Sequence, residues 1–362
     1  MSIGRYVKVF SPGGQYTRHS EGDFLRLKDG RILFAWCRFQ NSASDHAHCE
    51  LAGCWSDDEG ETWSEGRTLI SPDLYGVENV MSLSLMRMEN GDLGLFYLVK
   101  VKMDHSRIML SRSRDEGETF YEHIECSDPN RPFYYVVNNS RIERMKSGRL
   151  IIPAAYHRVT QGADGSWYFD GRSSATFFYS DDDGFNWHES ADMVYPPFTG
   201  TESGLQEPGV YETEAGGLRA YFRTDKMAHY ESFSVDGGIH WSVAQVSGFS
   251  GPCSPLEIVR SPKNGKLYAV WNPIPVYVGR EITRAGWGRT PLVCAVSEDD
   301  GMTWSKPITL ADDPERGYCY PAIFFTEDDC MLAAYCTGGP EERVCLAQLS
   351  IQKIPMKELS AE

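Results

Sequence analysis

The sequence predicts an all-β protein that folds as a six-bladed β-propeller with four-stranded antiparallel blades. Three observations support this fold class: a short turn motif recurs along the chain, an apolar hairpin pattern alternates with it, and no amphipathic stretch is long enough for a substantial helix. The chain has 362 residues, of which 41% are hydrophobic, so it can form a large core. Length alone suggests two or three domains, but internal repeats override that expectation.

The turn motif has the form S-x-D-x-G-x-T-W, and we refer to it as the Asp box. Its five copies span residues 56–63, 113–120, 180–187, 234–241 and 297–304, so that successive copies begin 57, 67, 54 and 63 residues apart. Such spacing is typical of one supersecondary unit per repeat.

The residue types of the Asp box are those of a tight turn. The aspartate, Asp58 in the first copy, can accept hydrogen bonds from backbone amides of its own turn. The glycine, Gly60 in that copy, permits a positive φ. The final aromatic residue is placed to pack beneath the hairpin. We therefore expect the Asp boxes to stabilise the fold rather than to perform catalysis.

A second pattern consists of an apolar strand, a polar turn and another apolar strand. It occurs six times, beginning at Phe24, Ser84, Arg141, Gly209, Glu257 and Ala322. Short strands around such turns are typical of β-hairpins. Five of these hairpins are followed by an Asp-box hairpin, which gives five four-stranded blades. We expect the sixth blade to be completed by the C-terminal strand from Val344 or by the N-terminal segment 5–10.

These repeats predict a single propeller domain over residues 1–362. A radial arrangement of blades leaves few exposed strand edges, which suits a large all-β chain. A propeller of seven blades is the alternative.

The charge balance excludes several classes of partner. Lys and Arg total 35 against 51 Asp and Glu, a net charge of −16. Such a surface repels nucleic acids and anionic membranes, and an anionic substrate would need a local cluster of arginines. No stretch approaches the 18 apolar residues of a membrane span.

The N-terminal segment and the cysteines favour a cytoplasmic protein. MSIGRYVKVFSPGG contains no apolar run typical of a signal peptide, although removal of a leader would make the protein secreted. The ten cysteines are scattered without a C-x-x-C motif, as expected for reduced core residues. His46 and His48 form an H-x-H pair, but no third ligand is identifiable, so we predict neither a metal site nor a cofactor.

Polar residues at the starts of the innermost strands form the candidate site. In a propeller these positions face the mouth of the central channel, and convergent polar groups in a concavity indicate a binding or active site. Counting back about ten positions from each hairpin turn gives Ser20, Met81, Asn138, Glu207, Pro255 and Tyr320. Further polar residues on the same strands are Arg18, Glu21, Asn139, Arg141, Gln206 and Ser254.

With these motifs the chain resembles the sialidase superfamily over nearly its whole length. In that family a catalytic Tyr stands at the start of the last inner strand, as Tyr320 does here. A Glu opens another inner strand and is followed by a pocket Arg, which matches Glu207 and Arg223. A further pocket Arg precedes the Tyr, at a place that Arg289 occupies.

The resemblance extends to one loop and breaks at the first inner strand. The acid/base Asp of the family lies before the first Asp box, where Asp45 stands beside His46. The family opens its first inner strand with an Arg in a Phe-Arg-Ile-Pro-like motif, but Ser20 occupies that position here. Arg18 lies two residues earlier on the same strand face, so it is one candidate to supply the missing positive charge. Alternatively, Glu21 takes its place and the substrate is not a sialic acid.

The resemblance implies hydrolysis of a terminal sialic acid or a related acidic sugar. The anomeric carbon of such a sugar bears a carboxylate, which repels a carboxylate nucleophile but not a neutral phenol. Tyr320 would attack that carbon, Glu207 would accept its proton, and Asp45 would protonate the leaving oxygen and then activate water. The expected substrate-binding residues are Arg18, Glu21, Arg223, Arg289, Asn138, Asn139 and His46.

Two alternatives remain open. In the first, the same pocket hydrolyses a neutral or uronic sugar, with Glu21, Asp45 and Glu207 as its carboxylate set. In the second, the propeller binds carbohydrate without catalysis, because Asp boxes also occur in proteins that lack hydrolase activity. In every case the expected partner is a carbohydrate, and the oligomeric state is not predicted.

Overall fold

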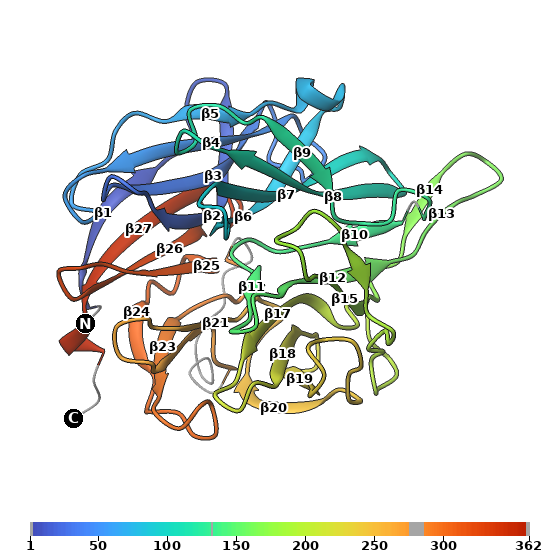
Figure 1. Cartoon of the computed structure of the whole chain (residues 1–362). Coiled ribbons are helices and arrows are strands. Elements are labelled where there is room, and N and C mark those ends of the chain that lie inside the picture. The colour runs from blue at the N-terminus through green and yellow to red at the C-terminus, as the bar shows by residue number, and fades with distance from the viewer. Residues whose placement is uncertain (1–2, 132, 275–285, 360–362) are drawn as a thin grey trace.

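The computed structural model describes residues 3–131, 133–274 and 286–359, and it shows an all-β, propeller-like arrangement of sheets (Figure 1). The described helical structure includes two short 3₁₀ turns, η1 (Pro72–Tyr75) and η3 (Met356–Glu358). None of the described helices is long and apolar enough to cross a membrane. The predicted fold class is therefore confirmed at the level of an all-β, propeller-like chain.

The two ends of the chain meet in one four-stranded sheet. Its order is β1-β27-β26-β25, and its strands are β1 (Arg5–Phe10), β25 (Gly317–Phe325), β26 (Cys330–Gly338) and β27 (Gln348–Pro355). The N-terminal strand pairs antiparallel with the C-terminal one, from Arg5 opposite Lys353 to Phe10 opposite Leu349. Both segments proposed from the sequence thus complete the last sheet, and they close the molecule by joining its ends.

Two further sheets are regular four-stranded antiparallel units. One contains β17 (Gln206–Glu212), β18 (Leu218–Arg223), β19 (Ala228–Ser234) and β20 (Gln245–Ser250) in chain order. The other contains β21 (Glu257–Arg260), β22 (Leu267–Trp271), β23 (Leu292–Ser297) and β24 (Ile308–Ala311). Their first strands contact edge strands of neighbouring sheets: β17 contacts β21, and β21 contacts β25.

The remaining strands do not form separate four-stranded blades. An eight-stranded sheet contains β2 (Tyr16–Arg26), β3 (Ile32–Gln40), β4 (Cys49–Ser56), β5 (Arg67–Ile70), β6 (Asn79–Arg87), β7 (Leu93–Lys102), β8 (His105–Ser113) and β9 (Glu122–Glu125). A five-stranded sheet contains β10 (Tyr134–Val136), β11 (Glu143–Arg144), β12 (Leu150–His157), β15 (Ser174–Ser180) and β16 (His188–Glu189). The two-stranded ribbon of β13 (Val159–Gln161) and β14 (Trp167–Phe169) projects from the body of the molecule (Figure 1).

The prediction of six separate four-stranded blades is therefore met only in part, for two local reasons. A single parallel bridge between Cys49 and Asn79 joins β4 to β6 and merges two groups of four strands. The Asn79 side chain holds this bridge by donating to the carbonyl of Ala47 at 2.7 Å. In the five-stranded sheet, the innermost strand is interrupted near Ser140, whose φ is 56°, so that β10 and β11 pair separately with β12.

The Asp boxes are closed by their own side chains, as expected. In the first copy, one oxygen of Asp58 accepts the Thr62 amide at 2.8 Å, and the other accepts the Thr62 hydroxyl at 2.5 Å. The Ser56 hydroxyl accepts the Gly60 amide at 2.8 Å, at a glycine whose φ is 83°. The indole of Trp63 donates to the Gly60 carbonyl at 3.1 Å, which places the aromatic ring beneath the turn.

Replacing Asp58 with alanine should lower the free energy of unfolding by about 1–2 kcal/mol, because the turn loses its acceptors. The pocket described below should not be affected, because Asp58 does not line it. Urea titration of the variant measures the loss. Asp57→Ala is the matched control, because Asp57 is exposed beside the same turn. Equal destabilisation of the two variants would contradict the role assigned to Asp58.

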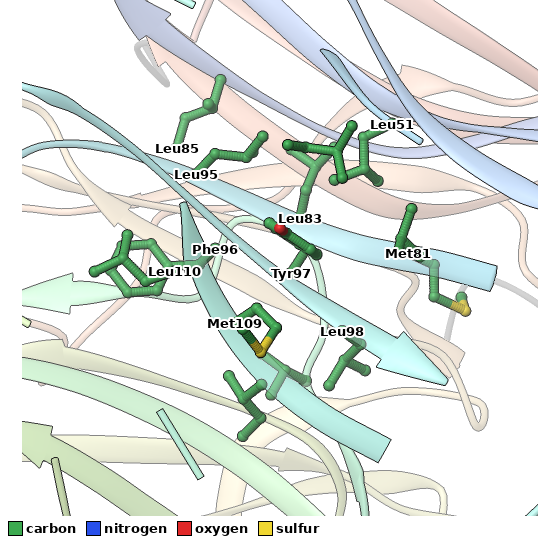
Figure 2. Close-up of a cluster of buried hydrophobic side chains, with 14 of the residues drawn as sticks. Leu51, Met81, Leu83, Leu85, Leu95, Phe96, Tyr97, Leu98, Met109 and Leu110 are labelled. Atoms are coloured by element: carbon green, nitrogen blue, oxygen red, sulfur yellow. The ribbon is translucent and has the colours of Figure 1, made fainter. Parts of the chain in front are cut away.

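The hydrophobic core lies between neighbouring sheets. Its largest cluster is built mainly from β3, β4, β6, β7 and β8 and includes Leu83, Leu95 and Tyr97, all almost fully buried (Figure 2). Met81 and Leu98 belong to the same cluster and also line the candidate pocket. The ten cysteines are all unpaired, and most of them are buried in this and the adjoining clusters. The floor of the pocket is therefore supported directly by the core.

Candidate active site

Four inner strands carry a bulge with a residue in the left-handed region. These residues are Glu21 on β2, Ser82 on β6, Glu207 on β17 and Tyr320 on β25, with φ between 45° and 56°. Each lies at a shift in the strand register. A positive φ costs a non-glycine residue about 1–3 kcal/mol, and such strain clusters at functional sites. All four residues line one pocket of about 500 Å³, so the bulge is the device that presents side chains there.

Most of the site residues predicted from the sequence meet in this pocket. Its lining includes eight of them: Glu21, Asp45, His46, Asn138, Glu207, Arg223, Arg289 and Tyr320. Arg18 and Asn139 do not line it. The segments that supply the pocket lie far apart in sequence and belong to different sheets, so their convergence follows from the propeller-like arrangement.

Tyr320, Glu207 and Arg223 form a connected cluster. The Tyr320 hydroxyl donates to Oε1 of Glu207 at 2.8 Å, and Nη1 of Arg223 donates to the same oxygen at 2.5 Å. Arg223 also approaches the Tyr320 hydroxyl at 3.4 Å. Burial and the negative charge of Glu207 raise the pKa of Tyr320 well above its usual range. The phenol is therefore neutral, and Glu207 is in position to remove its proton during a reaction.

Arg289 presents a buried positive charge. Arg289 is 4% exposed. Its guanidinium donates to the Cys253 carbonyl at 3.0 Å and to the Cys319 sulfur at 3.2 Å. Among the described residues no carboxylate pairs with Arg289, and its Nε has no hydrogen-bond partner. The Trp287 ring lies 4.9 Å from the guanidinium. A buried guanidinium on a pocket wall is a group with which an anionic ligand can pair.

Arg18 lies behind the pocket wall, bound to two carboxylates. Its guanidinium donates to Asp45 at 2.5 Å and to Glu21 at 3.0 Å, and its Nε donates to Ser20 at 2.9 Å. The side chain stacks on Phe39 and is 1% exposed. Arg18 therefore does not reach the pocket, contrary to the expectation, because these partners hold it between the strand and the loop.

The two neighbouring asparagines have different surroundings. Asn138 lines the pocket, and its Nδ2 is buried without a hydrogen-bond partner among the described residues. Asn139 instead donates to the carbonyls of Gly22 at 2.8 Å and Pro321 at 3.3 Å. Asn139 thus ties the segment between β10 and β11 to β2 and β25. Asn138, by contrast, offers a free donor to a ligand.

Several lining residues were not found by sequence reasoning. They include Lys100, Tyr134, His157 and Phe169. Phe169 ends the β13–β14 ribbon, stacks on His157 at 4.7 Å and meets Tyr134 at 5.5 Å. The run of three aromatic residues that ends at Phe169 is the one sequence signal that could have marked this wall. Aromatic faces of this kind suit the apolar faces of sugar rings.

No metal centre is indicated at the rim. The described residues contain no group of three or more His, Cys, Asp or Glu side chains placed to hold a metal ion. His48 lies 3.4 Å from Glu78 and does not line the pocket, whereas His46 does.

The fold is that of an all-β, propeller-like protein built from repeats of the BNR type. The chain belongs to the BNR repeat-like domain family, whose model matches residues 77–332. No curated protein sequence matches the chain.

Solved structures share the fold at low sequence identity. A protein of unknown function from Dyadobacter fermentans has a TM-score of 0.71 and 17% identity, covering 97% of this chain and 99% of that one. The NanB sialidase of Streptococcus pneumoniae has a TM-score of 0.72 and 15% identity, covering 98% and 71%. A Trypanosoma rangeli sialidase, solved as a covalent intermediate with 2,3-difluorosialic acid, has a TM-score of 0.69 and 14% identity, covering 94% and 55%. At these identities the likeness establishes the fold alone.

Proposed function

We propose that this chain is a sialidase-like exo-glycoside hydrolase that releases a terminal sialic acid or a related acidic sugar. The observation that carries the proposal is the hydrogen bond of 2.8 Å between the Tyr320 hydroxyl and Glu207 inside the pocket. A phenol paired with a carboxylate is an activated nucleophile, and it can approach an anomeric carbon that bears a negative charge. The ligand expected in the pocket is accordingly a glycan.

The proposed reaction has two steps. Tyr320 attacks the anomeric carbon while Glu207 takes its proton, which gives a glycosyl-tyrosine, and water then releases the sugar. Arg289 and Arg223 provide the positive charge that holds the carboxylate of the sugar. Asn138 offers its buried amide as a donor to a substrate hydroxyl.

We also infer that the chain forms one six-bladed domain over residues 1–362. The eight-stranded sheet is joined by one bridge only, between Cys49 and Asn79. If β2–β5 and β6–β9 are counted as two blades and the β13–β14 ribbon is left out, they form a ring of six with the four other sheets. The contacts of β2 with both β6 and β25 support this count.

Trapping the covalent intermediate tests the reaction. The chain should be incubated with 2,3-difluorosialic acid and digested, and its peptides should be measured by mass spectrometry. We expect the sugar on a peptide that contains Tyr320, and no label on the Tyr320→Phe variant. Labelling of a carboxylate instead would contradict the nucleophile. Absence of label, together with no turnover of a glycoside panel and measurable sugar binding, would favour a carbohydrate-binding protein without catalysis.

A different sugar is the second candidate, and one observation favours it. The bulge position of β2 carries Glu21, and Arg18 is neutralised by Glu21 and Asp45. The pocket wall at this point is therefore not positive, which suits a neutral sugar or a uronic acid with its carboxylate elsewhere on the ring. Turnover of such glycosides that survives Tyr320→Phe and is lost in Glu21→Gln would support this candidate.

A further inference from the structure

Two carboxyl groups share one arginine on the wall of the pocket. Arg18 donates through Nη1 to Asp45 and through Nη2 to Glu21. Both acids line the pocket that contains Tyr320. Cleavage of a glycoside requires a proton for the leaving oxygen, and only a group that carries a proton at the working pH can supply it. The two acids differ in that respect.

Asp45 is poorly suited to donate a proton. Its side chain is 56% exposed, and its Oδ1 lies 2.5 Å from Arg18. The Lys100 ammonium donates to the Asp45 carbonyl at 2.7 Å, which places a second positive charge beside the loop. Partial desolvation acts to raise the pKa of Asp45, but Arg18 and Lys100 outweigh it and lower the pKa below its usual range. Asp45 is therefore ionised.

Glu21 has the opposite surroundings. It is 3% exposed, and its two oxygens accept from Arg18 at 3.0 Å and from the Ser82 hydroxyl at 2.7 Å. Burial raises the pKa of Glu21 to about 7, against the opposing charge of Arg18. The negative charges of Asp45 and Glu207 act in the same direction as burial.

The remaining groups around Glu21 are weak acids that do not neutralise it. The thiol of Cys37 contacts the Glu21 carbonyl at 3.5 Å, and burial raises the pKa of Cys37 and of the nearby Cys336 well above their usual range. Arg18 is thus the one cation that pairs with Glu21 among the described residues, and it is shared with Asp45. Glu21 also occupies the same bulge position on β2 that Glu207 occupies on β17 and Tyr320 on β25.

We propose that Glu21 is the acid that protonates the leaving oxygen, and that Asp45 is a positioning residue that holds Arg18 in place. This assignment rests on the proposed hydrolase function and deepens it, since it replaces the loop aspartate expected from the sequence by a residue of the first inner strand.

In the first step of the reaction two bonds change and two protons move. The bond between the Tyr320 oxygen and the anomeric carbon forms, the bond to the leaving oxygen breaks, the Tyr320 proton passes to Glu207, and the Glu21 proton passes to the leaving group. In the second step water attacks the anomeric carbon and gives a proton to the Glu21 carboxylate. Tyr320 leaves and recovers its proton from Glu207. Both carboxyl groups return to their initial states.

Leaving groups of different acidity distinguish the two acids. The Glu21→Gln variant should be compared with the unmodified chain on 3′-sialyllactose, whose leaving sugar needs a proton, and on a trifluoromethylumbelliferyl sialoside, whose leaving phenol does not. We expect kcat/KM for sialyllactose to fall by about 10²–10⁴-fold, with a loss of less than about tenfold for the activated substrate. Asp45→Asn should lower both values by a similar factor, as expected for a positioning residue.

Two further readouts separate catalysis from structure. The alkaline limb of the kcat/KM profile, expected near the pKa of Glu21 at about 7, should disappear in Glu21→Gln. In a Glu21→Ala variant the shorter side chain leaves space for azide. Azide should then restore turnover of the activated substrate, because this anion attacks the glycosyl-tyrosine without the help of a base.

The outcomes discriminate among the hypotheses. Equal losses on the two substrates in Glu21→Gln, or the selective loss in Asp45→Asn instead, would overturn the assignment and leave the hydrolase function standing. If the unmodified chain cleaves neither sialoside, the function proposed above fails and this assignment fails with it.

Discussion

Replacing Tyr320 with phenylalanine is expected to lower kcat for the acidic glycoside by more than about 10³-fold. The variant keeps the ring at the bulge of β25 and loses only the oxygen that donates to Glu207 at 2.8 Å. Because Arg289 and Arg223 remain, KM should change far less than kcat. Steady-state kinetics on a fluorogenic sialoside measures both constants, and thermal unfolding verifies that the variant is folded.

Tyr318→Phe is the matched control for this prediction. Tyr318 lies two residues earlier on the same strand, is 4% exposed and accepts the Asp313 amide at 3.2 Å, but it does not line the pocket. Loss of its hydroxyl should affect stability slightly and leave kcat unchanged. If Tyr320→Phe retains most of its activity, Tyr320 is not the nucleophile, and a carboxylate must take that role.

Arg289→Gln is expected to lower kcat/KM for the acidic sugar by about 10²-fold, because the substrate carboxylate loses a buried guanidinium partner. Arg289 is 4% exposed, lines the pocket, and its Nε has no hydrogen-bond partner among the described residues. The informative measurement compares the sialoside with its methyl ester. The unmodified chain should strongly prefer the free acid, and the variant should lose most of that preference.

Arg316→Gln provides a control for this charge change. Arg316 pairs with Glu342 at 3.0 Å and does not line the pocket. It should leave the preference for the free acid intact. If Arg289→Gln lowers turnover of the acid and its ester equally, the arginine serves the fold and does not recognise the carboxylate.

Local patterns predicted the strands and turns well because their causes are local. The Asp58 carboxylate, the Ser56 hydroxyl and Gly60 lie within five residues of one another, and their hydrogen bonds are formed inside the turn. The hairpins likewise follow from apolar alternation around Gly- and Asp-rich turns. The sheet boundaries were harder to predict, since the bridge between Cys49 and Asn79 depends on an asparagine side chain that reaches another loop.

The residues of the site were predicted in part, and the errors of that prediction have identifiable causes. Counting residues from the hairpin turn placed Ser20 at the mouth of the channel, whereas its neighbour Glu21, which was also expected in the site, lines the pocket. A bulge inserts one unpaired residue, which shifts the side chains of a strand by one position. Arg18 was expected in the pocket because i and i+2 share a strand face, but its pairing with Asp45 depends on a loop conformation that no periodicity encodes.

By itself, the sequence determined the all-β class, the repeating turns and the residue types that the pocket contains, because backbone geometry and side-chain chemistry act over a few neighbouring residues. Only the tertiary structure decided which of those residues meet. Tyr320 and Glu207 are 113 positions apart in the sequence, yet their side chains are hydrogen-bonded at 2.8 Å. The two ion pairs of Arg18, with Asp45 and with Glu21, depend on how a loop packs against a strand. Long-range packing and burial set both the contacts and the charges, and neither can be read from residues that are adjacent in the chain.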